Sequence, residues 1–466
     1  MLRLRFSKLV NNFCYFLILF LIISYSISPK LFSKININFG VPVYTTELVI
    51  LIITVLLLSK VLLDGGKMII NVPLKLEFML FFLIFLISLF TGLFLYEDSE
   101  FVLRQSALFY YSIFYFLVIF ALSDVDNLLK LKYIFWLFFI SVNLMAAKYF
   151  ISIFGINFFK IIGFTIKGMG GAGYFYISLL LIIEVSLLMY MKKSVYTIVF
   201  FIDIIFLLAV AVLYSIRGDW VALIAALLFF WIIVGITPGL KRVLHNFNVV
   251  LLSSVIIITL VGLFVYIYNI GSSLSLFIKI KREFLSIFDV FLGDLSSSET
   301  ATRWRLNANL NTIWRLINWN EMFRDVLTKP VFGFGFGNKF LSYSAVALGW
   351  TTGVREGWVE SHNYLISFLY RSGFLGLGSF ILIIVSFFRK VFRFLRNCLD
   401  ERIKVIIAGL VSCIIYILVL GLLEVVLEVP YMGSFLWIIM GFIMVIINYY
   451  NKRTGSISRN ESKGTD

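Results

Sequence analysis

The chain has 466 residues, of which 61% are hydrophobic, 18% are aromatic and only 14% are charged. Soluble proteins contain about 45–50% apolar and about 25% charged residues, so this composition excludes a water-soluble globule. It also excludes intrinsic disorder and a secreted disulfide scaffold. The apolar runs are continuous and too long for the alternating strands of a membrane β-barrel. The sequence therefore predicts an all-α, polytopic membrane protein.

Twelve apolar segments are long enough to cross a bilayer as helices. They lie near residues 10–28, 46–63, 76–95, 105–122, 132–154, 174–191, 195–214, 218–236, 247–268, 362–388, 404–424 and 432–449. The first has too long an apolar core for a cleaved signal peptide, so we expect it to be retained. The predicted organisation is nine helices in 1–268, a large outer loop in 269–361, three helices in 362–450 and a disordered cytoplasmic tail in 451–466.

The distribution of basic residues predicts the orientation. With both chain ends in the cytoplasm, the inside segments carry 22 Lys and Arg residues and the short outside loops carry 6. Basic residues concentrate in cytoplasmic loops. The same bias explains most of the formal net charge of +15, so no nucleic acid partner is expected. We expect a multi-pass membrane protein, with the lipid bilayer itself as one partner.

One connector is much longer than the others: some 93 residues, 269–361, on the outer side. Long connectors are commonly functional or disordered, but ten basic and eight acidic residues with several tryptophans do not indicate disorder here. Residues 311–329 have the apolar spacing of a helix, which Pro330 ends. The Gly-Phe-Gly-Phe-Gly stretch at 333–337 predicts a turn, or backbone N–H groups offered to a cavity.

His362 is the histidine expected on the outer face, because His245 lies in a short cytoplasmic loop. It stands where the long loop enters the tenth apolar segment, beside Asn363. An imidazole can accept a proton near neutral pH, so His362 is a candidate base. The alternative is a helix-start residue at the membrane interface without a chemical role.

Two arginines are candidates for binding an anion at the same face. Arg217 lies in a tight outer turn, where its freedom is limited; it could instead pair with Asp219 or contact lipid phosphates. Arg315 lies one turn before Trp319 in the loop helix, where it could also be an ordinary solvated arginine. Arg104, at the outer start of the fourth span, is a second-rank anion contact.

Four charged residues fall within the spans, where they usually face a cavity or one another. They are Lys148, Glu184, Asp203 and Arg371. Lys148 could add to a positive cavity near Arg217. Glu184 and Asp203 lie in adjacent helices and would be the coupling residues of a transporter, for instance a flippase for lipid-linked sugars. No ATP-binding loop, metal cluster or Ser-His-Asp set is visible, so we expect no cofactor and no metal.

Three stretches together resemble the O-antigen ligase and O-antigen polymerase superfamily of bacterial membrane glycosyltransferases. They are Ser215-Ile216-Arg217-Gly218, then Trp314 to Trp319 leading to Pro330-Val331-Phe332-Gly333-Phe334-Gly335, then Ser361-His362-Asn363-Tyr364-Leu365 followed by Arg371 to Gly376. The resemblance runs from about Leu213 to Gly378, and its specificity lies in the order, spacing and common outer placement of the motifs.

The resemblance implies a metal-independent transfer of a glycan from an undecaprenyl-diphosphate carrier outside the cytoplasmic membrane. Arg217 and Arg315 would hold the diphosphate, and His362 would orient or deprotonate the acceptor hydroxyl, with Glu356 or Glu360 as alternative bases. Arg104, Lys148, Trp319 and Asn363 would be further substrate contacts.

Ligase and polymerase differ in the acceptor, which is a lipid-core sugar for the ligase and a second carrier-linked glycan for the polymerase. A single large outer loop favours the ligase slightly. O-antigen, capsule or exopolysaccharide polymerase remains the alternative.

Overall fold

The computed structural model describes residues 2–38, 42–63, 72–122, 127–153, 172–191, 195–214, 217–237, 314–340, 342 and 361–463. The N-terminal half of this part comprises α1 (Leu2–Ile27), α2 (Pro29–Phe32), the antiparallel pair β1 (Asn36–Asn38) and β2 (Pro42–Tyr44), α3 (Thr45–Leu63), α5 (Lys75–Leu95), α6 (Ser99–Gln105), α7 (Ala107–Tyr110), α8 (Ile113–Ala121) and α9 (Asn127–Ile153). The remaining described helices are α10 (Ala172–Tyr190), α11 (Val195–Tyr214), α12 (Arg217–Ile236), α17 (Tyr364–Asn397), α18 (Glu401–Gly421) and α19 (Pro430–Lys463).

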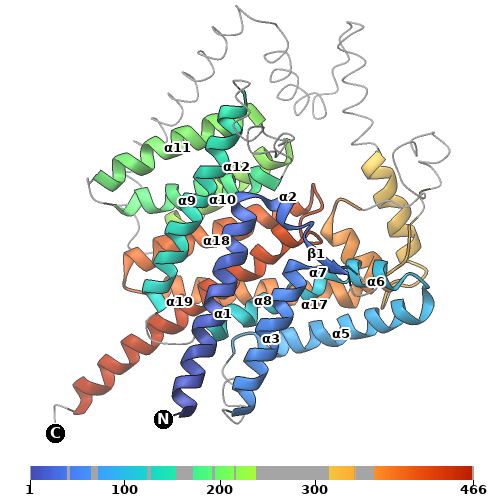
Figure 1. The fold of residues 1–466 in the computed structure, drawn as a ribbon, viewed down its shortest axis with the longest axis horizontal. Coiled ribbons are helices and arrows are strands. Elements are labelled where there is room, and N and C mark those ends of the chain that lie inside the picture. Colours follow the sequence, from blue (N-terminus) through green and yellow to red (C-terminus); the bar gives the residue numbers. More distant parts are fainter. Residues whose placement is uncertain are drawn as a thin grey trace, which may run out of the picture.

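Nine of the described helices are long and apolar enough to cross a membrane, and a bent pair could add a tenth. This confirms an all-α, polytopic membrane protein. The expected span at 247–268 lies outside the described residues. The expected span at 195–214 is helical as α11, of which Val195–Ala211 is the shorter apolar part. Figure 1 shows the start of α1 and the end of α19 on the same side of the molecule.

Three expected elements differ from the structure. The span at 105–122 is not one straight helix, because Ser99–Tyr110 and Ile113–Ala121 meet at an angle of 52°. The span at 362–388 is interrupted at Gly373, whose φ of 64° and ψ of −166° are not helical. The tail was expected to be disordered. It is instead a continuation of α19, which is helical as far as Lys463.

The core is formed by α10, α18 and α19. In the spanning part of α19, 89% of residues are buried, whereas the share in α5 is 28%. A helix that is apolar on all sides and surrounded by other helices belongs in the interior, and one whose outer face is apolar is suited to face lipid. α18 packs against both α10 and α12, α19 packs against α8, and α5 packs against α17. The connector between α18 and α19 is therefore held by central helices.

Candidate functional site

The start of α17 fixes His362 in an unusual backbone conformation. Asn363 is the N-cap, and its side-chain oxygen accepts hydrogen bonds from the backbone N–H groups of Leu365 (2.9 Å) and Ile366 (3.5 Å). The chain enters this cap through His362, whose φ is +50°. This left-handed conformation is rare for a residue with a side chain and persists where the surroundings impose it. The imidazole is therefore placed by the cap.

A helix formed by residues 314–326 lies against this turn. Its Trp319 donates an indole N–H hydrogen bond of 2.6 Å to the carbonyl of Ser361. Its Trp314 meets the imidazole of His362 edge-to-face, with 5.9 Å between ring centroids. Two tryptophans on one helix thus hold both sides of the His362 turn, and this position also brings Arg315 to the site.

Glu424, just after α18, joins Arg315 to His362. Arg315 donates from Nη1 to the carbonyl of Leu423 and from Nη2 to Oε1 of Glu424 at 3.3 Å. The other oxygen, Oε2, lies 3.7 Å from Nδ1 of His362. That separation is an ion-pair distance, longer than a hydrogen bond. A guanidinium and an imidazole therefore share one carboxylate.

The electrostatics of this group favour an ionised Glu424. Partial burial acts to raise the pKa of the Glu424 carboxyl, but the neighbouring His362 and Arg315 outweigh it, and the net effect is a lowered pKa. The side chains of Arg315, His362 and Glu424 are 20%, 30% and 33% exposed, so the site is partly open.

The start of α12 lies beside the same connector. A Cβ atom at Gly218 would lie 3.5 Å from Cβ of Leu423 and 3.6 Å from Cδ1 of Leu420. Arg217 is the first residue of α12. Its backbone is therefore adjacent to the residue whose carbonyl binds Arg315; its side chain is outside the described part of the structure.

A second carboxylate, that of Glu428, binds Arg371 and is linked to the His362 turn through two serines. It forms an ion pair with Arg371, with 3.0 Å between Nη1 of Arg371 and Oε1 of Glu428, and the two side chains are only 8% and 13% exposed. Oε1 also accepts a 2.6 Å hydrogen bond from Ser367, whose hydroxyl is 2.7 Å from that of Ser361. Arg371 is thus a structural residue, connected to the His362 turn through Ser367 and Ser361.

The glycine-rich segment at 333–337 is a packing turn. The N–H groups of Phe334 and Gly335 donate to the carbonyls of Tyr370 and Arg371, so at these two positions the N–H groups are not offered to a ligand. A Cβ atom at Gly373 would lie 2.3 Å from the carbonyl oxygen of Val331, and φ at Gly373 is +64°. This close approach requires glycine.

Comparison with known proteins bears on these same elements. Residues 202–381 match a family described as O-antigen ligase. This match supports the resemblance of the segment to the O-antigen ligase and polymerase superfamily. The matched residues include Arg217, Arg315 and His362, whereas Glu424 and Glu428 lie beyond them. No curated protein matches the chain. The O-antigen ligase match supports a glycosyltransferase-type membrane enzyme that acts on lipid-linked glycans.

The structure brings together some of the expected site residues and separates others. Arg315, Trp319, His362 and Asn363 form one group. Lys148 does not join it in the described contacts: its Nζ lies 5.5 Å from the ring centroid of Tyr149, on α9, which packs against α1, α10 and α11.

Arg104 is exposed near the end of α6. Its neighbour Gln105 bonds with Gly337 and Asn338, so this helix end adjoins the glycine-rich turn. Glu356, Glu360 and His245 lie outside the described residues.

The intramembrane carboxylates Glu184 and Asp203 lie close to each other, on α10 and α11. Glu184 is fully buried on α10 and interacts with Asp203 of α11. Asp203 accepts a 3.0 Å hydrogen bond from Asn143. Within the described residues, no group of three or more His, Cys, Asp or Glu residues could hold a metal ion.

Sequence reasoning missed Glu424 and Glu428. The available signal was two carboxylates four residues apart, in Leu-Glu-Val-Val-Leu-Glu-Val-Pro at the outer end of a span. Carboxylates in such a position need cationic partners. Arg315 and Arg371 were two such cations expected near the outer face.

Proposed function

We propose that this chain transfers a glycan from an undecaprenyl-diphosphate carrier to an acceptor hydroxyl, on the outer face of the bacterial cytoplasmic membrane. The acceptor proposed is a lipid A-core sugar or a similar lipid-linked sugar, as for a ligase. The observation that carries the proposal is the shared carboxylate: Glu424 holds the Arg315 guanidinium and the His362 imidazole within one partly open site.

The diphosphate of the donor would bind Arg315, with Arg217 as the second cation. A guanidinium offers paired donors that match phosphate oxygens. The position of Gly218 against Leu423 supports this pairing, because it brings the start of α12 to the backbone that binds Arg315. Arg104 and Lys148 are proposed as outer contacts for the carrier's charge.

The acceptor proton would pass to His362. Nδ1 of the imidazole faces Glu424, which favours the tautomer with the proton on Nδ1 and leaves the Nε2 lone pair for the acceptor. Catalytic hydrogen bonds are often long before substrate binds, and the 3.7 Å separation fits that pattern. Trp319 and Asn363 hold the turn around the imidazole, so we propose them as positioning residues.

The reaction is a displacement at the anomeric carbon. The acceptor oxygen forms a bond to that carbon while its proton moves to Nε2 of His362. The bond from the anomeric carbon to the phosphate oxygen breaks, and the electron pair leaves with the polyprenyl diphosphate. Arginines stabilise the charge that develops on this leaving group, and removing one such donor typically costs about 10²–10³ in rate.

The test uses the purified full-length chain with a carrier-linked oligosaccharide and two acceptors, a lipid-core sugar and a second carrier-linked glycan. His362→Ala and Arg315→Ala should abolish transfer. Arg324→Ala is the matched control, because Arg324 is exposed on the same 314–326 helix and should retain wild-type activity. Glu184→Gln should also remain largely active.

The acceptor decides between the two related activities. Product only with the lipid-core sugar supports the ligase, and lengthened carrier-linked glycan establishes the polymerase instead. Loss of function in Glu184→Gln together with activity in His362→Ala would replace the enzyme proposal with a transporter.

A further inference from the structure

A large apolar cavity is lined by residues other than those of the His362 group. It has a volume of about 320 Å³ and is lined by residues of α1, α9, α10, α18 and α19. Leu410, Ile403 and Ile406 line it from the first half of α18, whereas Glu424 follows the end of that helix. Because a helix rises about 1.5 Å per residue, Leu410 and Glu424 are separated by about 20 Å along the axis. The cavity is therefore a separate feature of the molecule.

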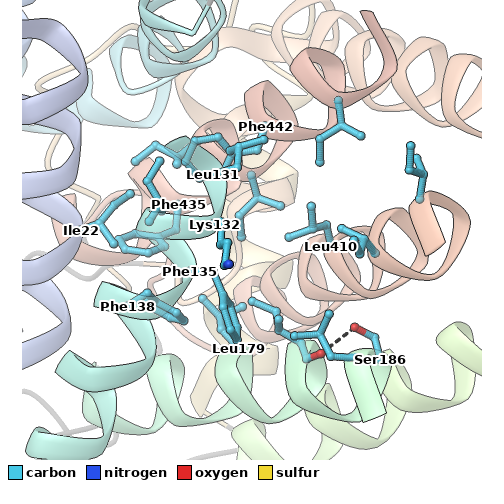
Figure 2. Close-up of a pocket in the computed structure, with 18 residues that line it drawn as sticks. Ile22, Leu131, Lys132, Phe135, Phe138, Leu179, Ser186, Leu410, Phe435 and Phe442 are labelled. Atoms are coloured by element: carbon cyan, nitrogen blue, oxygen red, sulfur yellow. Dashed lines mark hydrogen bonds between the residues drawn. The ribbon is translucent and has the colours of Figure 1, made fainter. Parts of the chain in front are cut away.

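The lining of this cavity suits hydrocarbon. Figure 2 shows aromatic and aliphatic side chains on both sides, among them Phe135, Phe138, Phe435 and Phe442. The hydroxyl of Ser186 is already donated to the carbonyl of Ile183 at 2.6 Å. Apolar cavities of about 150 Å³ stay dry and take up small apolar molecules. A cavity of twice that size, within membrane-spanning helices, is suited to part of a lipid chain.

One cationic side chain, that of Lys132, lines this cavity. Lys132 lines it from the first turns of α9, and Figure 2 shows its side chain reaching among the apolar residues. Its side chain is exposed, and among the described residues no carboxylate forms an ion pair with it. Lys132 lies near the end of the span Lys130–Ile151, which is the depth of lipid headgroups. The apolar lining suits the acyl chain of an anionic lipid, and the lysine at headgroup depth suits its negatively charged headgroup.

We propose that this cavity binds an anionic phospholipid, with one acyl chain among the aromatic residues and the phosphate on Lys132. The lipid comes from the leaflet opposite the His362 group, because α18 and α19 separate the two sites along their length. Basic pockets between membrane helices are a known means of binding anionic headgroups. The proposal does not depend on the glycosyltransferase activity.

The test is photocrosslinking of the full-length chain in phosphatidylcholine nanodiscs that contain phosphatidylglycerol with a diazirine in its acyl chain. Crosslinks should concentrate on peptides that contain Phe138, Leu410 and Phe442. Leu410→Trp, which fills the cavity, should remove these crosslinks. The matched control Leu228→Trp should retain them, because Leu228 is 59% exposed on α12.

Lys132→Gln tests the headgroup without altering the core. It should lower the preference for phosphatidylglycerol over diazirine-labelled phosphatidylcholine by about fivefold. Lys390→Gln, an exposed lysine on α17, should leave that preference unchanged. Crosslinks spread over the lipid-facing helices, or equal labelling of Leu410→Trp and Leu228→Trp, would overturn the site. Equal labelling by both lipids in the wild type, or stronger labelling by a polyprenyl phosphate, would overturn the phospholipid assignment.

Discussion

Replacing Glu424 with glutamine separates the two halves of the proposed mechanism. The amide keeps the shape of the side chain but removes the charge that Arg315 and His362 share. In the wild type this carboxylate competes with the donor's diphosphate for Arg315, and it also orients the imidazole. Glu424→Gln should therefore bind the donor more tightly and transfer it more slowly.

The size of the binding effect follows from the geometry. Unit charges at the observed 3.3 Å interact by about 5 kcal/mol at an effective dielectric constant of ~20 and by about 1.3 kcal/mol at ~80. Since the Arg315 and Glu424 side chains are 20% and 33% exposed, solvent screening favours the lower value, about 1.3 kcal/mol. That corresponds to a dissociation constant about tenfold lower. Single-turnover transfer should fall by about tenfold or more, because the imidazole loses its anionic partner.

The assay measures donor binding to the purified protein and, separately, single-turnover transfer at saturating donor. Glu97→Gln is the control, because Glu97 is exposed before α6 and should change neither quantity. Weaker donor binding by Glu424→Gln, or an unchanged transfer rate, would refute the reasoning that this carboxylate links the two cations.

Three further predictions concern stability. Arg371→Met should destabilise the fold by about 3–5 kcal/mol, since it leaves the Glu428 carboxylate, only 13% exposed, without its partner, and adding Glu428→Leu should recover much of that loss in the same unfolding assay. Gly373→Ala should cost more than about 1 kcal/mol, because its Cβ would collide with the carbonyl of Val331 at a positive φ; an unchanged unfolding midpoint would argue against the packed turn. The lowered pKa of Glu424 means that its stabilising contribution is present at neutral pH and is lost as the pH falls through the folded-state pKa. Wild-type stability should therefore decline more steeply in acid than that of Glu424→Gln, and parallel pH curves would contradict the assigned ion pairs.

The spans were predictable because each is a continuous apolar run, a signal that depends only on local sequence. The helix over 314–326 was also readable from its apolar spacing, and the predicted start of the tenth span at residue 362 lies two residues before Tyr364, where α17 begins. The break at Gly373 was not, since a single glycine within an apolar run is compatible with an unbroken helix. Its cause is the close approach of Val331, a residue 42 positions earlier.

The site was predictable only in part for the same reason. His362 and Arg315 were chosen as residue types able to do chemistry on the expected outer face. Their common partner is Glu424, which is 109 residues from Arg315 in the chain. A sequence does not reveal which of its carboxylates such a cation will meet, because that depends on how α18 and the 314–326 helix pack.

The central claim is that Arg315 holds the donor and His362 activates the acceptor. The most direct test measures donor binding and single-turnover transfer for His362→Ala and Arg315→Ala in parallel. The account predicts that the histidine variant binds donor with wild-type affinity but transfers nothing, whereas the arginine variant loses donor affinity. Transfer at the wild-type rate without the imidazole, or undiminished donor affinity without the guanidinium, would contradict it.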